Sequence, residues 1–344
     1  MKAVTFEGPG AVAVNDVEDP ALKDERDAIL RVTASAICGS DLHVYNGRLP
    51  IPLRGWVLGH EYVGVVEEVG SGVSGLAKGD RVVGSFMAAC GECFYCERGW
   101  PTQCVKQQHL GFGQVPGAQA QYLRVPFADV TLFKTPDTAS DEALVCVGDV
   151  LATGYFAVEQ AAIQPGDVVV VVGCGAVGLY AIMCARLFGP STVVALDSLP
   201  DRLALARALG AVPLNTGEGN PGSAIRQLSG GRGADIVIEA VGQEETIRAC
   251  FSYVRPAGTI SVVGVYSEAQ FAYPMFVAFL RNIRFLIGLC PATRYMPELL
   301  RLIESSKIDP AKVITHELPL AEASRAYEMF ANRTDSCTKV ILRP

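Results

Sequence analysis

The sequence has no run of lysine or arginine, and its formal net charge is −7 over 344 residues. Proteins that bind nucleic acid or lie on anionic membranes carry clustered basic residues, so we expect neither partner. Internal repeats and low-complexity tracts are also lacking. The first residues, 1–7, include an acid and no apolar stretch of the kind that signal peptides have, so a cytoplasmic protein is expected.

Long apolar runs are scarce as well. Residues 168–185 form a charge-free segment of 18 residues, the lower limit for a membrane-spanning helix. Its five valines are followed by Gly173, Gly175 and Gly178. This pattern favours a buried parallel strand, a tight turn and a helix, and no membrane span is expected.

Cysteine is abundant, with eleven residues, but its placement does not suggest a secreted disulfide protein. Four of the cysteines follow the spacing C-x2-C-x2-C-x7-C, namely Cys90, Cys93, Cys96 and Cys104. Four thiolates complete the tetrahedral coordination of a zinc ion and leave no position for substrate. We therefore predict a structural zinc site here, and the chemistry must lie elsewhere.

The chain is longer than a single core usually supports, so two domains are expected. Short β-rich runs up to about residue 150 predict a mostly β domain. Strands alternate with helices over 151–289, which predicts a doubly wound parallel sheet of the Rossmann type. We expect the tail, 290–344, to return to the first domain. The predicted strands are 29–33, 62–69, 81–83, 168–172, 192–196, 235–239, 259–263 and 339–342, and the predicted helices are 177–188, 202–209, 296–305 and 322–331.

A G-x-G-x-x-G motif follows the five valines and opens the next helix, with Asp197 at the end of the following strand. In this context the motif predicts dinucleotide binding, with the pyrophosphate at the helix N-terminus. The motif residues expected to contact the cofactor are Gly173, Gly175, Ala176, Val177 and Gly178. Asp197 favours NAD, because a carboxylate accepts ribose hydroxyls but repels the 2′-phosphate of NADP. The alternative is that Asp197 caps the N-terminus of the following helix. Arg202 could pair with the 2′-phosphate, so NADP remains an open alternative.

Further metal-type residues lie upstream, with Cys38 in C-G-S-D and His60 in G-H-E. The latter segment, with Gly64, Gly70 and Val73, fits the signature G-H-E-x2-G-x5-G-x2-V of the zinc-dependent medium-chain alcohol dehydrogenases. Together with the cysteine lobe and the nucleotide motif, the chain resembles this family over essentially its full length. The resemblance implies a GroES-like catalytic domain over 1–150 and 290–344 and a Rossmann domain over 151–289.

The resemblance also implies a third ligand for a catalytic zinc, for which Asp149 is the expected residue and Cys146 the competitor. Such a site leaves the fourth zinc position open. Asp41 would fix the His60 tautomer, unless it is an ordinary turn aspartate. By the same resemblance, Glu61 approaches zinc during ligand exchange, and Ser40 and His43 form a proton relay. The nicotinamide would contact Thr153, Val263 and Val265. Lys339 would either meet the pyrophosphate or lie in solvent. Trp56 and Phe86 are candidate pocket walls because they precede the motifs closely.

We therefore expect an NAD-dependent enzyme with two zinc ions per chain that interconverts a small alcohol or polyol and its aldehyde or ketone. An aldehyde dismutase with tightly bound NAD is the alternative within the fold, since an aspartate ligand is typical of formaldehyde-dehydrogenase-like members. A non-catalytic NAD-binding protein is less consistent with the intact set of metal-type residues. A nucleic-acid-binding module is less consistent with the acidic net charge. The family resemblance implies a homo-oligomer, a tetramer, with a dimer surface expected near Thr259–Val265.

Overall fold

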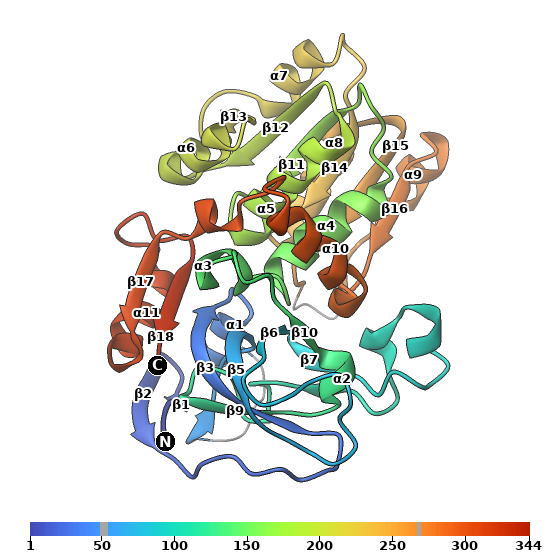
Figure 1. Ribbon diagram of the computed structural model, residues 1–344. Helices are drawn as coiled ribbons and strands as arrows, with labels where there is room; N and C mark the ends of the chain where they lie inside the picture. Colours follow the sequence, from blue (N-terminus) through green and yellow to red (C-terminus); the bar gives the residue numbers. More distant parts are fainter. Residues whose placement is uncertain (49–53, 267–269) are drawn as a thin grey trace. The chain divides into compact units, whose positions relative to one another are not determined.

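The computed structural model describes residues 1–48, 54–266 and 270–344, and the chain forms two compact units (Figure 1). The first unit is Met1–Ala152 with Pro291–Pro344, and the second is Thr153–Cys290. These boundaries lie within two residues of the division expected from the sequence. No helix in the described ranges is both long and apolar enough to cross a membrane.

The first unit is built mainly of antiparallel strands. Its main sheet, among the described residues, has seven strands, with β9 (Tyr122–Val125) pairing with the first half of β3 on the edge opposite β5. The order of the others is β10 (Leu132–Lys134), β6 (Arg81–Gly84), β5 (Glu61–Val69), β3 (Ala28–Ile37), β18 (Val340–Arg343) and β17 (His316–Pro319). Two smaller sheets pair β2 (Ala11–Asp16), β1 (Lys2–Gly8) and β4 (Trp56–Val57), and β7 (Met87–Ala88) with β8 (Gln108–His109).

The tail returns to the first unit, as the sequence predicts. Strand β18 pairs antiparallel with β3, with Val340 opposite Ile37 and Ile341 opposite Ala36, and the two ribbons lie side by side in Figure 1. The apolar face of the C-terminal helix α11 (Ala323–Asn332) packs with β18 in one hydrophobic core. The helices of this unit are α1 (Asp41–Tyr45), α2 (Ala128–Thr131), α3 (Asp141–Leu144), α10 (Ala292–Glu304) and α11 (Ala323–Asn332).

The second unit is a parallel sheet whose strand order is that of the classic dinucleotide-binding fold. In the described residues it runs β13 (Val212–Asn215), β12 (Thr192–Asp197), β11 (Val168–Val172), β14 (Ala234–Glu239), β15 (Val254–Val262) and β16 (Arg284–Ile287). The accompanying helices are α4 (Val150–Ala161), which begins in the first unit, α5 (Ala176–Ala185), α6 (Pro200–Ala208), α7 (Pro221–Leu228), α8 (Glu244–Tyr253) and α9 (Met275–Leu280).

The predicted strand–turn–helix over 168–185 is confirmed. All five valines of β11 are buried, as expected for a strand covered on both faces. The sequence-based interpretation missed β13 and β16, the two edge strands. Both are only four residues long and partly exposed, so they lack the continuous apolar pattern of the central strands.

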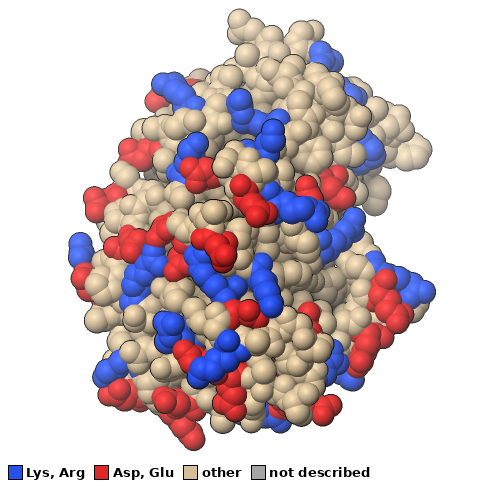
Figure 2. Space-filling view, in the orientation of Figure 1, with Lys and Arg blue, Asp and Glu red and all other residues tan. Residues whose placement is uncertain are grey.

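Charged side chains of both signs are interspersed over the face displayed in Figure 2. No extensive blue region occurs on that face. This distribution agrees with the absence of basic runs in the sequence, because a nucleic-acid footprint needs clustered positive charge.

Candidate active site

Three metal-type side chains meet in the first unit. Their ligand atoms, one each from Cys38, His60 and Asp149, all lie within 4.8 Å of one another. The Nε2 atom of His60 is 3.0 Å from Asp149 Oδ2, and the His60 side chain is only 2% exposed. The structure therefore brings Asp149, and not Cys146, together with the other two residues.

The register of two strands explains why Cys38 and His60 meet although 22 residues separate them. Cys38 follows β3 and His60 precedes β5, and these antiparallel strands pair Ala36 with Glu61. Gly59 makes the turn into β5 at a φ of +92°, and a Cβ there would lie 2.4 Å from Gln119. Asp149 stands immediately before α4.

The electrostatics of this group suit a cation. Burial alone would lower the pKa of His60, but Asp41 and hydrogen bonds to Asp149 raise it well above its usual value. Burial, and then the Asp149 charge, raise the pKa of the Cys38 thiol to about 11. A divalent ion reverses this preference, since a thiolate and a carboxylate supply two negative charges beside a neutral imidazole. The three donors thus fit the catalytic zinc of the family.

A chain of buried polar groups lies behind His60. Its Nδ1 is 3.1 Å from Asp41 Oδ1, although the angle is too poor for a regular hydrogen bond. Asp41 Oδ2 accepts hydrogen bonds from the Cys38 backbone N–H (2.9 Å) and the Gln119 amide (3.3 Å). Tyr327 in turn donates to Gln119 Oε1 at 2.8 Å. Asp41 thus faces His60 and also closes the turn at Cys38, so its role in orienting the histidine stays a prediction; Gln119 and Tyr327 belong to no motif and were missed.

The structure corrects the prediction for Lys339. Its side chain is fully buried and its ammonium pairs with Glu61, also donating to the Ile37 carbonyl at 2.9 Å. Burial alone would lower the pKa of Lys339, but Glu61 raises it, so the ammonium stays charged. An ammonium enclosed in this way is neither in solvent nor presented to a pyrophosphate. It neutralises Glu61, whose Oε1 has no hydrogen-bond partner in the described structure.

Ser40 is the N-cap of α1, and His43 lies in the first turn of this helix. Ser40 Oγ is 3.1 Å from His60 Nε2, while His43 is half-buried three residues further along. Burial, and then Arg48, lower the pKa of His43, so its imidazole is neutral near pH 7. The described contacts place the Ser40 hydroxyl beside the metal-type side chains, and the relay through His43 stays a prediction.

The two candidate pocket walls differ in their surroundings. The backbone N–H of Phe86 donates to the Gly148 carbonyl at 3.1 Å, which places Phe86 beside the segment that holds Asp149. Trp56 lies on β4, where it pairs with Phe6, and its role in a pocket stays a prediction. Phe112 was missed; its ring centroid is 5.0 Å from that of His60.

The four cysteines of the lobe also come together, with ligand atoms within 4.8 Å of one another. The Cys93–Cys96, Cys90–Cys104 and Cys90–Cys96 sulfur distances are 3.5, 3.4 and 4.0 Å. A tetrahedron with zinc–sulfur bonds of about 2.3 Å has edges of about 3.8 Å, so the group matches a structural zinc site. Backbone N–H groups of Cys96 and Val105 lower the pKa of Cys93 to about 6, favouring its thiolate.

In the second unit the glycine motif forms the turn from β11 into α5. Gly173 has a φ of +91°, and a Cβ on Gly178 would lie 1.8 Å from the Gly173 carbonyl oxygen, so only glycine fits. Ala176 and Val177 form the first turn of α5, whose free N–H groups face the position of a pyrophosphate. The geometry is that of a dinucleotide-binding turn.

Asp197 ends β12 next to this turn. Its Oδ2 accepts a hydrogen bond from the Cys174 N–H at 2.7 Å, and its Oδ1 accepts from Ser198 and Leu199. The N-cap of α6 is Leu199, so Asp197 is not the cap of that helix. Arg202 Nη1 lies 4.0 Å from Asp197, close to the motif. The carboxylate is thus held rigidly where a ribose is expected.

The other predicted cofactor contacts belong to separate segments. Thr153 lies in the first turn of α4, and Val263 and Val265 follow β15 at the carboxyl edge of the sheet. Glu239, at the end of β14, was missed because an acid at a strand end carries no motif. It is fully buried and accepts several backbone hydrogen bonds.

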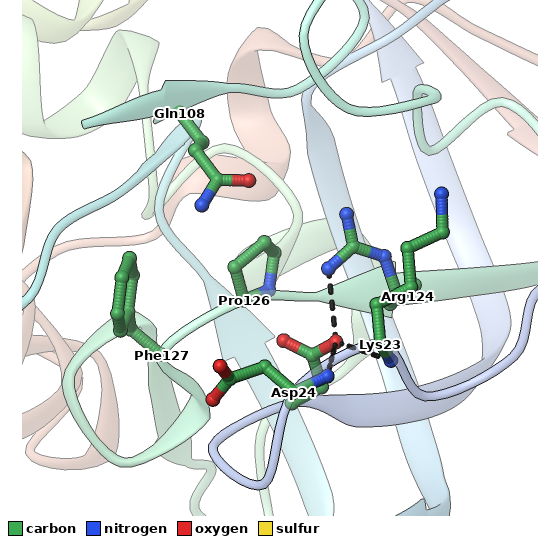
Figure 3. A pocket seen from close by; sticks show the side chains of 7 residues that line it. Lys23, Asp24, Gln108, Arg124, Pro126 and Phe127 are labelled. Carbon is green, nitrogen blue, oxygen red and sulfur yellow. Dashed lines mark hydrogen bonds and ion pairs between the residues drawn. The ribbon is translucent and has the colours of Figure 1, made fainter. Parts of the chain in front are cut away.

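A separate pocket of about 230 Å³ lies in the first unit (Figure 3). Lys23, Asp24, Asp27 and Arg124 line it, with Arg124 paired to Asp27 at 2.9 Å. The two cations and two acids balance, and none of the predicted site residues contributes. This pocket is not part of the candidate active site.

Comparison with known proteins agrees with the geometry of both units. Residues 24–137 match the alcohol dehydrogenase GroES-like domain, and residues 176–305 match the zinc-binding dehydrogenase domain. The Bacillus subtilis protein AdhB, an uncharacterized zinc-type alcohol dehydrogenase-like protein, is 39% identical, with all of both chains covered. The solved alcohol dehydrogenase TADH from Thermus sp. ATN1 is 42% identical, with a TM-score of 0.96 over 100% of this chain and 99% of that one.

More distant solved structures contain nicotinamide cofactors. A putative zinc-binding dehydrogenase from Sinorhizobium meliloti 1021 binds NADP (28% identity, TM-score 0.89), and rspB from E. coli CFT073, an alcohol dehydrogenase, binds NADH (25%, 0.90). Each alignment covers 100% of this chain and 99% of the neighbour. With its two domain matches, full-length relatives and paired metal-type clusters, the chain belongs to the zinc-dependent medium-chain alcohol dehydrogenase family.

Proposed function

We propose that this alcohol dehydrogenase uses NAD and two zinc ions per chain to interconvert a small primary or secondary alcohol, or a polyol, with its aldehyde or ketone. The observation that supports this most directly is the group of Cys38, His60 and Asp149. It supplies three donors and two negative charges, as a catalytic zinc with an open position requires. The four-cysteine lobe would hold the second, structural ion.

The chain's own residues account for the handling of protons. Zinc, when bound, polarises the alcohol oxygen and makes it more acidic, so that a hydride can pass to nicotinamide. Ser40 stands 3.1 Å from the ligand nitrogen of His60, where its hydroxyl can accept a proton from the substrate oxygen. The neutral His43 imidazole provides the next acceptor toward solvent. The reverse reaction uses the same groups in the opposite direction.

We assign the preference for NAD to Asp197, and Asp197→Ala tests it. The change removes an acceptor for the ribose hydroxyls and the repulsion of a 2′-phosphate. At about 1.5–3 kcal/mol for a hydrogen bond to a charged group, the NAD:NADP ratio of kcat/KM should fall at least about 10-fold. The measurement is reduced nicotinamide formation with each cofactor over a panel of small alcohols.

Two variants control for the other contacts of Asp197. Asp197→Asn keeps acceptors for the turn N–H groups but loses the charge, so its ratio should also fall. Asp201→Asn, a change to an exposed acid on α6, should leave the ratio unchanged. An unaltered ratio in both Asp197 variants would remove the assignment. Net accumulation of NADH in the same assay would contradict the aldehyde dismutase alternative. The relatives described above give that alternative no support.

We propose that the protein is a homo-oligomer whose dimer forms through one edge of the second unit. The expected edge near Thr259–Val265 needs correction, because β15 is paired on both sides and β16 is the edge strand. The helix α9 and the strand β16 (both orange in Figure 1) carry exposed apolar side chains, namely Met275, Phe276, Phe279, Leu280 and Ile287. A second copy pairing the same edge about a two-fold axis covers both the strand and the apolar side chains. The tetramer implied by the family would join two such dimers.

Phe279→Lys should break this dimer. Phe279 is 76% exposed, so the substitution leaves the folded chain intact but places a charge in the proposed interface. Light scattering after size exclusion should show the mass falling by half or more toward the 36.6 kDa monomer. Val212→Lys, on the opposite edge strand β13, is the matched control and should keep the native mass. A Phe279→Lys protein of native mass would rule out this surface.

The cytoplasmic location also stays a proposal. All eleven cysteines are thiols and not disulfides in the structure, which is consistent with a reducing compartment.

A further inference from the structure

Glu239 is a buried acid without a cation beside it. It ends β14, is fully buried, and is in no ion pair within the described part of the chain. Its Oε1 accepts hydrogen bonds from the N–H groups of Val241 (3.0 Å) and Gly242 (2.9 Å) and from the Thr246 hydroxyl (2.7 Å). A buried acid costs stability unless such partners satisfy it. The side chain therefore fastens the segment 241–246 that follows its own strand.

The same residue also holds a second loop. The main-chain carbonyl of Glu239 accepts hydrogen bonds from Val263 (2.9 Å) and Gly264 (3.1 Å), which follow β15. A Cβ on Gly264 would lie 2.6 Å from Glu239 Oε2 and 2.2 Å from Gly242 N. A Cβ on Gly242 would lie 2.3 Å from the Val265 carbonyl oxygen. The loops 240–243 and 263–265 are therefore pressed against each other and against the carboxyl group.

These loops stand at the point where the strand order of the sheet reverses. Strands β11 and β14 are neighbours there, with Val172 opposite Glu239, and their following turns are in contact. The Ala240 N–H donates to the Val172 carbonyl at 2.9 Å, and a Cβ on Gly173 would lie 2.4 Å from Val241. In open α/β sheets the cofactor binds outside the carboxyl ends at this position.

We propose that Glu239 is a positioning residue for the dinucleotide: its carboxyl group fixes segment 241–246, against which loop 263–265 packs, so that the backbone of Val263–Val265 is preformed for the nicotinamide. The inference rests on the proposed function, because it concerns the cofactor of that reaction. Glu239 acts through the two loops and is not assigned a contact with substrate.

The role depends on the acceptor and not on the charge. Burial raises the pKa of Glu239, so its neutral form is accessible, and both forms keep an oxygen toward the donors. Glu239→Gln retains an oxygen at the Oε1 position. Glu239→Ala leaves the N–H groups of Val241 and Gly242 without their acceptor, while the Thr246 hydroxyl keeps only the Gln243 carbonyl (2.8 Å), so the loops should lose their fixed arrangement.

The test is the dissociation constant of NADH, measured by fluorescence titration of the zinc-loaded protein. Glu239→Ala should raise it at least about 10-fold, and Glu239→Gln by less than about 3-fold. The KM for cofactor should rise in the alanine variant while the KM for alcohol stays near its native value. Both zinc ions should be retained. Glu245→Ala, a change to an exposed acid on α8, is the matched control and should bind NADH normally.

Amide hydrogen exchange without cofactor provides an independent readout. Residues 240–246 and 263–265 should exchange faster in Glu239→Ala than in the native protein or in Glu239→Gln. If the alanine variant does not fold, Thr246→Val is tested in its place, because it removes one hydrogen-bond donor to Glu239. This variant should speed amide exchange in the same segments and raise the dissociation constant of NADH about 3-fold. A native protein that binds neither NADH nor NADPH would refute the proposed function while the exchange result still reports on the loops.

Two outcomes would overturn the inference itself. One is a folded Glu239→Ala protein, or Thr246→Val in its place, with native NADH affinity and native exchange in both loops. The other is a Glu239→Gln protein as impaired as the alanine variant, because the charge and not the acceptor would then be required.

Discussion

Cys38→Ala should lose one of two zinc ions and nearly all dehydrogenase activity while remaining folded. The thiolate supplies half of the negative charge in the group with His60 and Asp149, so the remaining pair holds a divalent ion poorly. Zinc provides several kcal/mol of transition-state stabilisation, and about 1.4 kcal/mol corresponds to a factor of ten. We therefore expect kcat/KM to fall about 1000-fold or more, measured together with the metal content per chain.

Cys146→Ala is the matched control for this change. Cys146 is also buried and lies three residues before Asp149, but it does not belong to the group of metal-type donors. It should keep two zinc ions and native turnover. Full activity and two zinc ions in Cys38→Ala, or loss of zinc in Cys146→Ala, would show that the ligand set is wrong. The thermal transition of Cys38→Ala should stay close to that of the native protein.

Cys93→Ser should lose the other zinc ion and lower stability before it affects chemistry. The four cysteines cross-link the lobe between Cys90 and Cys104, a loop of 15 residues. By analogy with a covalent link across such a loop, the stabilisation lost is about 3 kcal/mol. At roughly 2–4 °C per kcal/mol for a domain of this size, Tm should fall by roughly 6–12 °C in scanning calorimetry.

Zinc analysis and limited proteolysis separate this effect from a general loss of structure. The variant should contain one zinc ion per chain and be cut first within residues 90–104, while kcat at low temperature stays within about 3-fold of native. Glu92→Gln is the control, because Glu92 is 59% exposed and only pairs with Arg26 and Lys106 at the surface. A Cys93→Ser protein with two zinc ions and native Tm would contradict a structural zinc in the lobe.

Local patterns were sufficient for much of this protein. The five valines and the glycine motif predicted β11, the turn and α5, because burial on both faces and tight backbone turns restrict the residues that fit. The spacing of Cys90, Cys93, Cys96 and Cys104 predicted their cluster, since ligands close in sequence reach one ion without help from distant segments. Chain length and the change from β-rich runs to alternating strands and helices predicted two domains and a parallel sheet, and the family resemblance added the GroES-like assignment of the first domain.

Edges and buried polar partners could not be read in the same way. The strand β16 is short and partly exposed, so the edge of the sheet was placed one strand too early. The pairing of Lys339 with Glu61 joins residues 278 apart in sequence, and the Tyr327–Gln119 hydrogen bond joins residues 208 apart. No local pattern encodes such contacts, because each depends on which strands and helices lie side by side.

The amino-acid sequence by itself determined the family, the fold class, the closed cysteine cluster and the residue types of the second metal group. Only the tertiary structure decided that Asp149 and not Cys146 joins Cys38 and His60, that Lys339 neutralises Glu61, and that Glu239 fastens two loops. The physical reason is range: backbone propensity and ligand spacing act over a few residues. Burial, charge pairing and hydrogen-bond satisfaction are decided by segments that the folded chain brings together.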